Sequence, residues 1–238
     1  MHQYSFYVLP DKINENTAIL TGDDFRHCIQ VLRKKIGDEV SLVDGRGNIF
    51  HSTIQECTKT ACTCRILSRE THTTDLNIKI ILGFGLVKAK ALELIIRDAT
   101  ALGVHSIVPL QTTHSIKQRL NADRAHKIAV ESIKQSGNCY LPKIERPQSL
   151  AAWFKGLNSN VVKIVCDQES DGKLSELLSD SGSVKSIAVL VGPEGGLCED
   201  ELKMVFNAGF VSINLNPFRL RTELAVVAAI SSICSLMK

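Results

Sequence analysis

The sequence predicts an α/β protein in which a parallel sheet flanked by helices follows a smaller β-rich module. From residue 78 onward, apolar segments rich in β-branched residues alternate with segments of helical periodicity, as in a parallel sheet with helices on both faces. Before residue 70 the apolar segments are short, often alternating and separated by turns, which is typical of a compact barrel. At 238 residues, the chain is long enough for two such domains.

Four strands and one helix are expected in the N-terminal module. The strands are predicted over residues 4–9, 39–43, 49–55 and 61–67. Asp23 or Asp24 is placed to cap a helix that ends at Leu32. The polar stretch over residues 68–77 lacks periodicity and is the predicted linker between the modules.

Five strands alternate with five helices in the second part. The strands are expected over residues 78–84, 106–110, 161–166, 187–191 and 211–215, and the helices over residues 89–102, 122–135, 150–154, 199–208 and 222–237. The last helix is apolar but shorter than the ~20 residues of a membrane span, so we interpret it as a buried helix. Thr222 is expected to be its N-cap.

Composition is that of an ordinary globular protein, with 44% hydrophobic and 22% charged residues and a net charge of +3. The eight cysteines and the lack of a leader pattern favour free thiols in a reducing cytoplasm. Cys57, Cys62 and Cys64 are interpreted as core residues rather than zinc ligands, because structural zinc usually needs four recognisably spaced ligands. No metal site is expected.

Common nucleotide-binding signatures are absent. There is no P-loop, and the segment that begins Gly83-Phe84-Gly85 has Lys88 where a Rossmann fingerprint needs its third glycine. No nucleophile elbow or metalloprotease motif is present either.

Two strand ends indicate where the chemistry lies. The strand over residues 187–191 runs into Gly192-Pro193-Glu194-Gly195-Gly196, and the next strand runs into the segment 216–223. Ligands of α/β proteins collect at strand ends, so one pocket built from both loops is predicted. Glu194 lies in a glycine turn, where a carboxylate is either solvated or part of a site. Arg219 and Arg221 precede a helix and suit a carboxylate or phosphate, or are plain surface charges.

Basic residues cluster in two places. The first cluster contains Arg26, Arg33, Lys34 and Lys35, and the second contains Arg119 and Arg124. A run of charges is usually a solvated surface, but two runs in two modules could follow a phosphate backbone.

The chain resembles the RsmE-type rRNA methyltransferases of the SPOUT class over nearly its whole length. The resemblance rests on H-x-x-x-V-L-R at residues 27–33, Ala99-Thr100-x-Leu102-Gly103-Val104, Gln135-Ser136-Gly137, the loop 191–196, and Leu220-Arg221-Thr222-Glu223. The order and spacing of the last two motifs are the most specific part.

The resemblance implies a PUA-like RNA-binding β-barrel over residues 1–72. Residues 73–238 would form a SPOUT domain, a parallel sheet whose C-terminal segment is threaded into a deep trefoil knot. It also implies a homodimer that binds S-adenosylmethionine and methylates N3 of one uridine in 16S rRNA of the small ribosomal subunit, with no membrane or metal partner.

Site residues follow from the same resemblance. Cofactor contacts would come from Leu82, Gly83, Leu190, Val191, Gly192, Glu194, Gly196, Leu215, Asn216, Leu220, Arg221 and Thr222. Arg221 would position substrate or cofactor, and Glu194 or Glu223 would accept the N3 proton. The six residues of the two basic clusters would bind RNA.

The chain departs from the family pattern at a few positions. Ala101, Asn138, Asn216, Cys198 and Ser5 replace residues that the family usually has. The alternatives are a SPOUT enzyme that acts on tRNA or a ribose, an RNA-binding protein without catalysis, and an unrelated metabolite-binding enzyme. The match of the N-terminal module argues against a tRNA or ribose enzyme, and the intact glycines argue against a protein without catalysis. An unrelated metabolite-binding enzyme would leave the two basic clusters unexplained.

Overall fold

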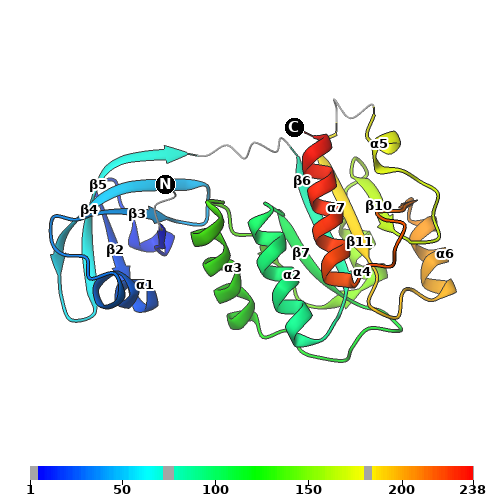
Figure 1. Ribbon diagram of the computed structural model, residues 1–238, viewed down its shortest axis with the longest axis horizontal. Coiled ribbons are helices and arrows are strands. Elements are labelled where there is room, and N and C mark those ends of the chain that lie inside the picture. The colour runs from blue at the N-terminus through cyan, green and yellow to red at the C-terminus, as the bar shows by residue number, and fades with distance from the viewer. Residues whose placement is uncertain (1–4, 72–77, 180–183, 238) are drawn as a thin grey trace. The chain divides into compact units, whose positions relative to one another are not determined.

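The computed structural model describes residues 5–71, 78–179 and 184–237 and divides into two compact units. The N-terminal unit contains the residues up to 74 together with Val130–Leu141, and the second unit contains Asp75–Ala129 and Pro142–Lys238 (Figure 1). Helix α3 (Ala122–Ser136) therefore begins in the second unit and ends in the first. The predicted boundary after residue 72 lies outside the described residues.

A five-stranded sheet forms the N-terminal unit. Its strands are β1 (Ser5–Tyr7), β2 (Thr17–Thr21), β3 (Glu39–Val43), β4 (Asn48–Cys57) and β5 (Ala61–Thr71). The order is β1-β3-β4-β5-β2, and only the β1–β3 pair is parallel. The sequence did not predict β2, and the predicted linker was wrong for residues 68–71, which continue β5 beside β4. Residue 4 and residues 72–77 of the predictions lie outside the described residues.

The helix expected up to Leu32 is divided. Helix α1 (Gly22–Arg26) continues into a π-helical turn, η2 (His27–Val31), and a 3₁₀ turn, η1 (Pro10–Lys12), lies earlier in the chain. Leu32 N–H donates to the carbonyl of His27, the i→i−5 bond of a π-turn. Arg33 then has φ +55, which ends the helical segment.

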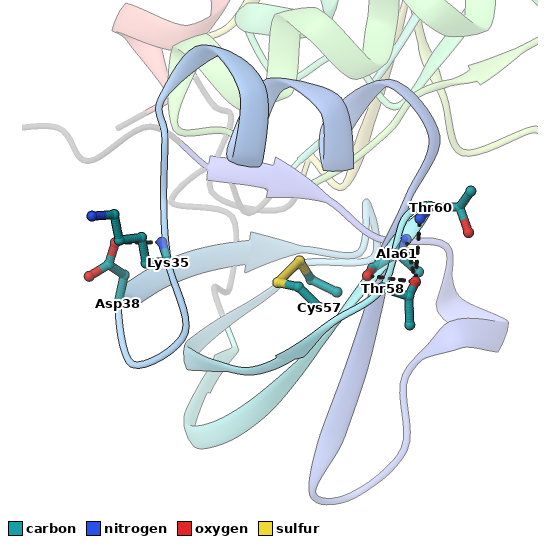
Figure 2. Close-up of a disulfide and its surroundings, with 7 residues drawn as sticks. Lys35, Asp38, Cys57, Thr58, Thr60 and Ala61 are labelled. Carbon is teal, nitrogen blue, oxygen red and sulfur yellow. Dashed lines mark hydrogen bonds between the residues drawn. A yellow bond between two sulfur atoms is a disulfide. The ribbon is translucent and has the colours of Figure 1, made fainter.

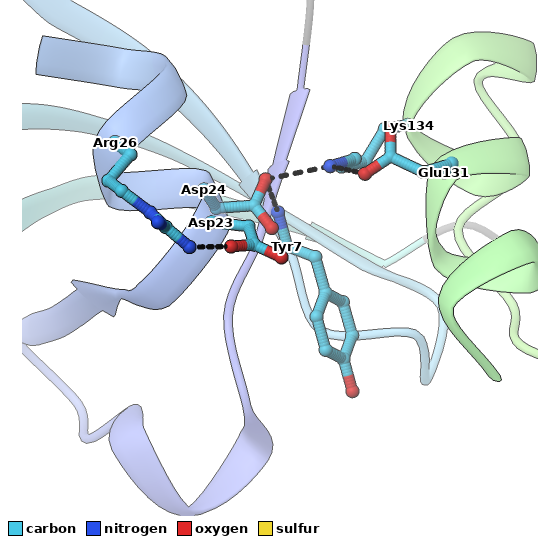
Figure 3. Close-up of polar contacts among 6 residues, drawn as sticks. All are labelled: Tyr7, Asp23, Asp24, Arg26, Glu131 and Lys134. Atoms are coloured by element: carbon cyan, nitrogen blue, oxygen red, sulfur yellow. Dashed lines mark hydrogen bonds and ion pairs between the residues drawn. The ribbon is translucent and has the colours of Figure 1, made fainter. Parts of the chain in front are cut away.

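The end of α3 completes the N-terminal unit. Ile133 and Cys139 pack with Val43 in a small buried cluster. Gly47 N–H donates to the carbonyl of Cys139 at 2.9 Å, and Leu141 N–H donates to Gly45 at 2.9 Å. Figure 3 shows the ammonium group of Lys134 between the carboxylates of Asp24 and Glu131. Segments more than 80 residues apart in the chain therefore share one core.

A disulfide corrects the expectation of free thiols at two of the eight cysteines. Cys57 and Cys62 face each other across the β4–β5 hairpin with their Cα atoms 4.3 Å apart, and their sulfur atoms are bonded (Figure 2). The hairpin register creates this proximity, which periodicity along one strand cannot reveal. Cys62 and Cys64 are both fully buried, as predicted. The six cysteines other than the bonded pair Cys57 and Cys62 are free.

The second unit is built on an entirely parallel sheet. The main path of this seven-stranded sheet is β12-β10-β11-β6-β7-β8, and β9 also pairs with β7. The strands are β6 (Lys79–Gly85), β7 (Ser106–Gln111), β8 (Lys143–Ile144), β9 (Gln148–Ser149), β10 (Val162–Cys166), β11 (Ser186–Val191) and β12 (Val211–Ile213). The five predicted strands are confirmed to within two residues at each end, and β8 and β9 are too short for periodicity to reveal.

Helices cover both faces of this sheet. They are α2 (Ala89–Ala101), α4 (Leu150–Gly156), α5 (Leu174–Leu177), α6 (Glu199–Asn207) and α7 (Thr222–Leu236). Helices α2 and α7 lie side by side (Figure 1). Trp153 of α4 and Val205 of α6 pack in one cluster with Ala188 and Leu190 of β11. All five predicted helices are present, and the four-residue α5 was not predicted.

Candidate active site

The carboxyl ends of β10, β11 and β12 surround a pocket with a volume of about 390 Å³. This is within the usual range for small-molecule sites. Three segments provide almost all of its lining, namely residues 165–169, 191–197 and 214–222. Because parallel strands end at one edge of a sheet, the three connecting loops meet there.

The loop after β11 makes a tight turn in front of α6. Gly196 N–H donates to the carbonyl of Pro193 at 2.8 Å, and Gly196 has φ +71. Gly85, at the end of β6, allows this loop to come close, because a Cβ atom there would lie 2.4 Å from Cδ of Pro193. Glycines at the strand end and in the turn therefore set the shape of the pocket wall.

The loop before α7 is held by its own asparagine side chains. Asn216 N–H donates to Oδ1 of Asn214, and Phe218 N–H donates to Oδ1 of Asn216, each at 2.9 Å. The Asn214 side chain also donates to the carbonyl of Gln168, at 3.0 Å. Successive turns of this kind give the segment a fixed path without regular secondary structure.

Thr222 joins the two loops and corrects its predicted role. The N-cap of α7 is Arg221, and Thr222 is the first residue of the helix. The hydroxyl of Thr222 donates to the carbonyl of Gly192 at 3.0 Å, and the residue is buried. The hydroxyl therefore holds the start of the β11 loop instead of capping a helix.

Eight of the predicted cofactor residues line the pocket: Val191, Gly192, Glu194, Gly196, Leu215, Asn216, Leu220 and Thr222. Leu82, Gly83 and Leu190 do not, because their strands are buried in the sheet. Gly83 allows the ring of Trp153 to pack against β6, because a Cβ atom there would lie 2.4 Å from that ring. The structure places Arg221 and Glu223 at the start of α7, outside the pocket lining.

The sequence reading missed the third segment of the pocket. Cys166, Asp167, Gln168 and Glu169 follow β10 and line the pocket. Burial raises the pKa of the Cys166 thiol to about 12, so Cys166 lines the pocket as an uncharged thiol at neutral pH. The polar residues directly after the apolar strand β10 could have indicated this segment, because the other two loops were identified from strand ends of the same kind.

The loop after β7 also contacts the site. His114 Nδ1 lies 3.2 Å from the carbonyl oxygen of Gly196. Thr113 donates to Oε1 of Glu201 through its N–H at 2.7 Å and its hydroxyl at 3.1 Å. Burial acts to raise the pKa of Glu201, but these bonds and one from Cys198 N–H outweigh it and hold the pKa below its usual value.

The predicted RNA-binding residues have different surroundings. In the N-terminal unit, Arg26 pairs with Asp23 (Figure 3). The Lys34 ammonium group donates to the carbonyl of Glu39 at 3.1 Å. Arg33 is exposed in its left-handed conformation. The pairings leave Arg33 better placed for a ligand than Arg26.

The remaining basic positions are also at the surface. Lys35 is exposed, and its N–H donates to the carboxylate of Asp38 (Figure 2). In the second unit, Arg124 forms an ion pair with Glu93 at 3.0 Å. Arg119 lines a separate pocket at the start of α3.

No group of three or more His, Cys, Asp or Glu residues arranged for a metal ion occurs in residues 5–71, 78–179 and 184–237. Over the same described ranges, no helix has the length and apolar character to cross a membrane.

Comparison with known proteins agrees with this geometry. A family model described as an RNA methyltransferase domain matches residues 74–234, and a model of an RNA methyltransferase PUA domain matches residues 20–67. The ribosomal RNA small subunit methyltransferase E of Bacillus subtilis is 28% identical over 245 residues, covering 98% of this chain and 96% of that protein. The enzyme of the same name from Rickettsia conorii is 29% identical, covering 97% and 95%.

A solved structure resembles the fold along the full length. It is the ribosomal RNA small subunit methyltransferase E of Neisseria gonorrhoeae bound to S-adenosyl methionine, with a TM-score of 0.88 and 26% identity. The likeness covers 99% of this chain and 98% of that chain. With both domain models matched in order and the pocket at the expected strand ends, the chain belongs to the RsmE-type family of RNA methyltransferases.

Proposed function

We propose that this protein transfers a methyl group from S-adenosylmethionine to N3 of one uridine in 16S rRNA of the small ribosomal subunit. The observation that carries the proposal is the pocket at the ends of β10, β11 and β12, in a chain that matches the named rRNA methyltransferases along its length. The solved relative that binds S-adenosyl methionine supports the choice of cofactor.

The pocket fits an adenosyl group with a charged amino-acid arm. Among the described residues, the N–H groups of Glu194, Gly195 and Leu197 have no acceptor, so they are available to acceptor atoms of a ligand. Asp167 and Glu169 line the pocket from the segment after β10, and their carboxylates are suited to accept hydrogen bonds from ribose hydroxyls. The remaining lining mixes polar groups with apolar side chains such as Val165, Leu197 and Leu215.

The cofactor supplies an activated methyl group on its sulfonium, so the protein's main task is alignment. Uridine N3 loses a proton during transfer. We propose that Glu194 accepts it, because Glu194 lines the pocket and Glu223 does not. Arg221, at the start of α7, would stabilise negative charge that develops on the base.

RNA binding is proposed for the basic residues of both units: Arg26, Arg33, Lys34, Lys35, Arg119 and Arg124. We assign RNA recognition to residues 1–72 and the reaction to residues 73–238, with residues 130–141 serving the N-terminal unit. We also propose a homodimer in the cytoplasm and a knotted C-terminal segment. The bond from Thr222 to Gly192 and the packing of α7 beside α2 support the knot.

The test is methyl transfer from labelled S-adenosylmethionine to small subunits from a strain that lacks this protein, with the product identified by nucleoside mass spectrometry. We expect 3-methyluridine at one site. Glu194→Gln should lower kcat about a hundredfold, within the usual range for a lost general base, whereas Glu223→Gln should lower it less than tenfold. A different methylated nucleoside would contradict the target. Cofactor binding without transfer to small subunits would point to another RNA, and no binding would favour a non-catalytic RNA-binding protein.

A further inference from the structure

Three alternate carbonyl groups of the loop after β11 each accept a hydrogen bond from a side chain elsewhere in the second unit. Thr222 Oγ1 donates to Gly192 at 3.0 Å, Arg219 Nη2 donates to Glu194 at 3.1 Å, and His114 Nδ1 lies 3.2 Å from the oxygen of Gly196. The first two donors belong to the loop that forms the other wall of the pocket, whereas His114 comes from the loop after β7.

His114 packs directly over the glycine turn. A Cβ atom at Gly195 would lie 2.8 Å from Cβ of His114, so the turn can approach only because Gly195 lacks a side chain. A carbonyl oxygen can only accept, which makes Nδ1 of His114 the donor. Nε2 then has no partner among the residues that the structure describes, and the imidazole is exposed at the surface.

Hydrogen bonds hold the loop that carries His114. Thr112 N–H donates to Oγ of Ser115 at 2.9 Å, and this hydroxyl donates back to the Thr112 carbonyl at 2.8 Å. Thr113 is fixed to the carboxylate of Glu201 by two bonds, at 2.7 and 3.1 Å. His114 therefore projects from a turn that is anchored on both sides.

The bond to Gly196 controls the direction of a neighbouring donor. In a trans peptide, the C=O of one residue and the N–H of the next point in opposite directions within one plane. Fixing the Gly196 carbonyl toward His114 therefore aims the N–H of Leu197 away from His114. Gly196 and Leu197 both line the pocket, and this N–H has no acceptor among the described residues.

We propose that His114 is a positioning residue of the reaction, which holds the Gly196–Leu197 peptide so that Leu197 N–H is presented to an acceptor atom of the bound cofactor. The inference rests on the proposed function, because it needs S-adenosylmethionine in this pocket. Glycine residues leave the turn with more conformational freedom than any other residue would. The bond from His114 removes that freedom before the ligand arrives, which lowers the entropy cost of binding.

The proposed role is independent of the charge of His114. The Nδ1–H group is present both in the neutral form that donates through Nδ1 and in the imidazolium form. Charged groups near the contact are Glu194 in the facing loop, Arg219 bonded to that loop, Glu201 of α6 and Lys117 three residues further along the chain. Any side chain that donates an N–H to Gly196 can therefore substitute, including arginine, which cannot act as a base.

The experiment compares donor and non-donor variants of the full chain by calorimetric titration with S-adenosylmethionine. We expect His114→Ala and His114→Phe to raise the Kd about tenfold, the effect of one net hydrogen bond, and His114→Arg and His114→Asn to stay within about threefold of wild type. His105→Ala, next to the opposite end of β7, is the matched control and should leave the Kd unchanged. In the methyl transfer assay, the non-donor variants should raise KM for the cofactor and leave kcat within about threefold.

Three results would overturn the inference. The first is an unchanged Kd in His114→Ala and His114→Phe. The second is a loss in His114→Arg as large as that in His114→Ala. The third is a pH profile of kcat that has a break near neutral pH in the wild type and none in His114→Arg, which would make His114 a general base. A wild-type protein that binds no S-adenosylmethionine would instead refute the proposed function and this inference together.

Discussion

The ammonium group of Lys134 on α3 lies 3.0 Å from Oδ1 of Asp24 on α1, and the Lys134 side chain is only 2% exposed. Glu131, one turn earlier on α3, accepts a second bond from the same group at 2.5 Å (Figure 3). Burial acts to lower the pKa of Lys134, but the bonds and charges of Glu131 and Asp24 outweigh it and raise the pKa. Burial raises the pKa of Asp24. The pair therefore ties the end of α3 to the N-terminal unit through a charge with little contact with water.

Replacement of Lys134 alone should be strongly destabilising. Lys134→Met leaves Asp24 buried without its cation, and breaking a buried pair in this way costs about 3 to 5 kcal/mol. In the double variant Asp24→Asn/Lys134→Met no buried charge remains, so most of the loss should be recovered. Urea unfolding of the three proteins measures the difference. Equal loss in the single and double variants would contradict this account.

The effect of Lys134 should not vary across neutral pH. Its pKa in the folded protein lies above the unfolded value. The stabilisation is therefore fully present below the ordinary lysine pKa of about 10.4 and is lost as pH rises through the folded pKa. The difference in unfolding free energy between wild type and Asp24→Asn/Lys134→Met, in which Asp24 cannot titrate, should be the same at pH 6 and pH 9. A difference that already falls between these values would show that the folded pKa is lowered.

Gly47 and Gly37 form a matched pair for testing the contact with the segment after α3. Both have φ +94, but a Cβ atom at Gly47 would lie 2.2 Å from the ring of Tyr140, whereas nothing lies within 4 Å at Gly37. Gly37→Ala should cost about 1 to 2 kcal/mol for the backbone conformation alone. Gly47→Ala should cost about 1 to 3 kcal/mol more because of the clash. Chemical denaturation gives both values, and equal costs would mean that Tyr140 does not pack there.

The disulfide in the β4–β5 hairpin should make stability depend on reductant. For a loop as short as that between Cys57 and Cys62, the chain-entropy model gives about 2 kcal/mol. Adding dithiothreitol should lower the unfolding free energy of the wild-type protein by about this amount and leave Cys57→Ser unaffected. The same response in both proteins would mean that the two thiols are not bonded in solution.

Cofactor affinity should be sensitive to a methyl group at the end of β6. In Gly85→Ala the added Cβ atom would overlap Pro193, 2.4 Å away, and displace the pocket wall. We expect a Kd for S-adenosylmethionine at least about tenfold higher, equivalent to about 1.4 kcal/mol. Gly156→Ala, where nothing lies within 4 Å of the new atom, is the control and should bind normally. Normal binding by Gly85→Ala would show that the β11 loop can move without loss.

The sequence predicted the elements that periodicity defines and missed those that contacts define. Strands such as β7 and helices such as α2 carry long apolar patterns, and their predicted bounds agree with the structure. Strand β2 is a short sequence with polar residues on both sides, and it forms by antiparallel pairing with the edge of β5. Strand β9, with two residues, is likewise fixed only by pairing with β7.

The same distinction applies to the pocket. Its glycine loop and the segment before α7 were predicted because glycine, proline and asparagine in the sequence favour the turn conformations that these segments adopt. The assignment of Thr222 as an N-cap was wrong, because its hydroxyl has an acceptor thirty residues away in Gly192 that local sequence does not reveal. His114 could not be found at all, since its partner, the Gly196 carbonyl, is a backbone group.

The division of α3 between two units has a consequence for synthesis of the protein. The core around Val43 includes Ile133 and Cys139, so the N-terminal unit lacks part of its interior until residue 141 has left the ribosome. At about 5 to 20 residues per second, the strands up to β5, which ends at Thr71, wait roughly 3.5 to 14 seconds for Leu141. During this interval, of the strands that the structure describes in the second unit, only β6 and β7 emerge. The N-terminal unit can therefore complete its core only once residue 141 has emerged, and a synonymous change that slows translation between β5 and α3 would prolong its exposed state.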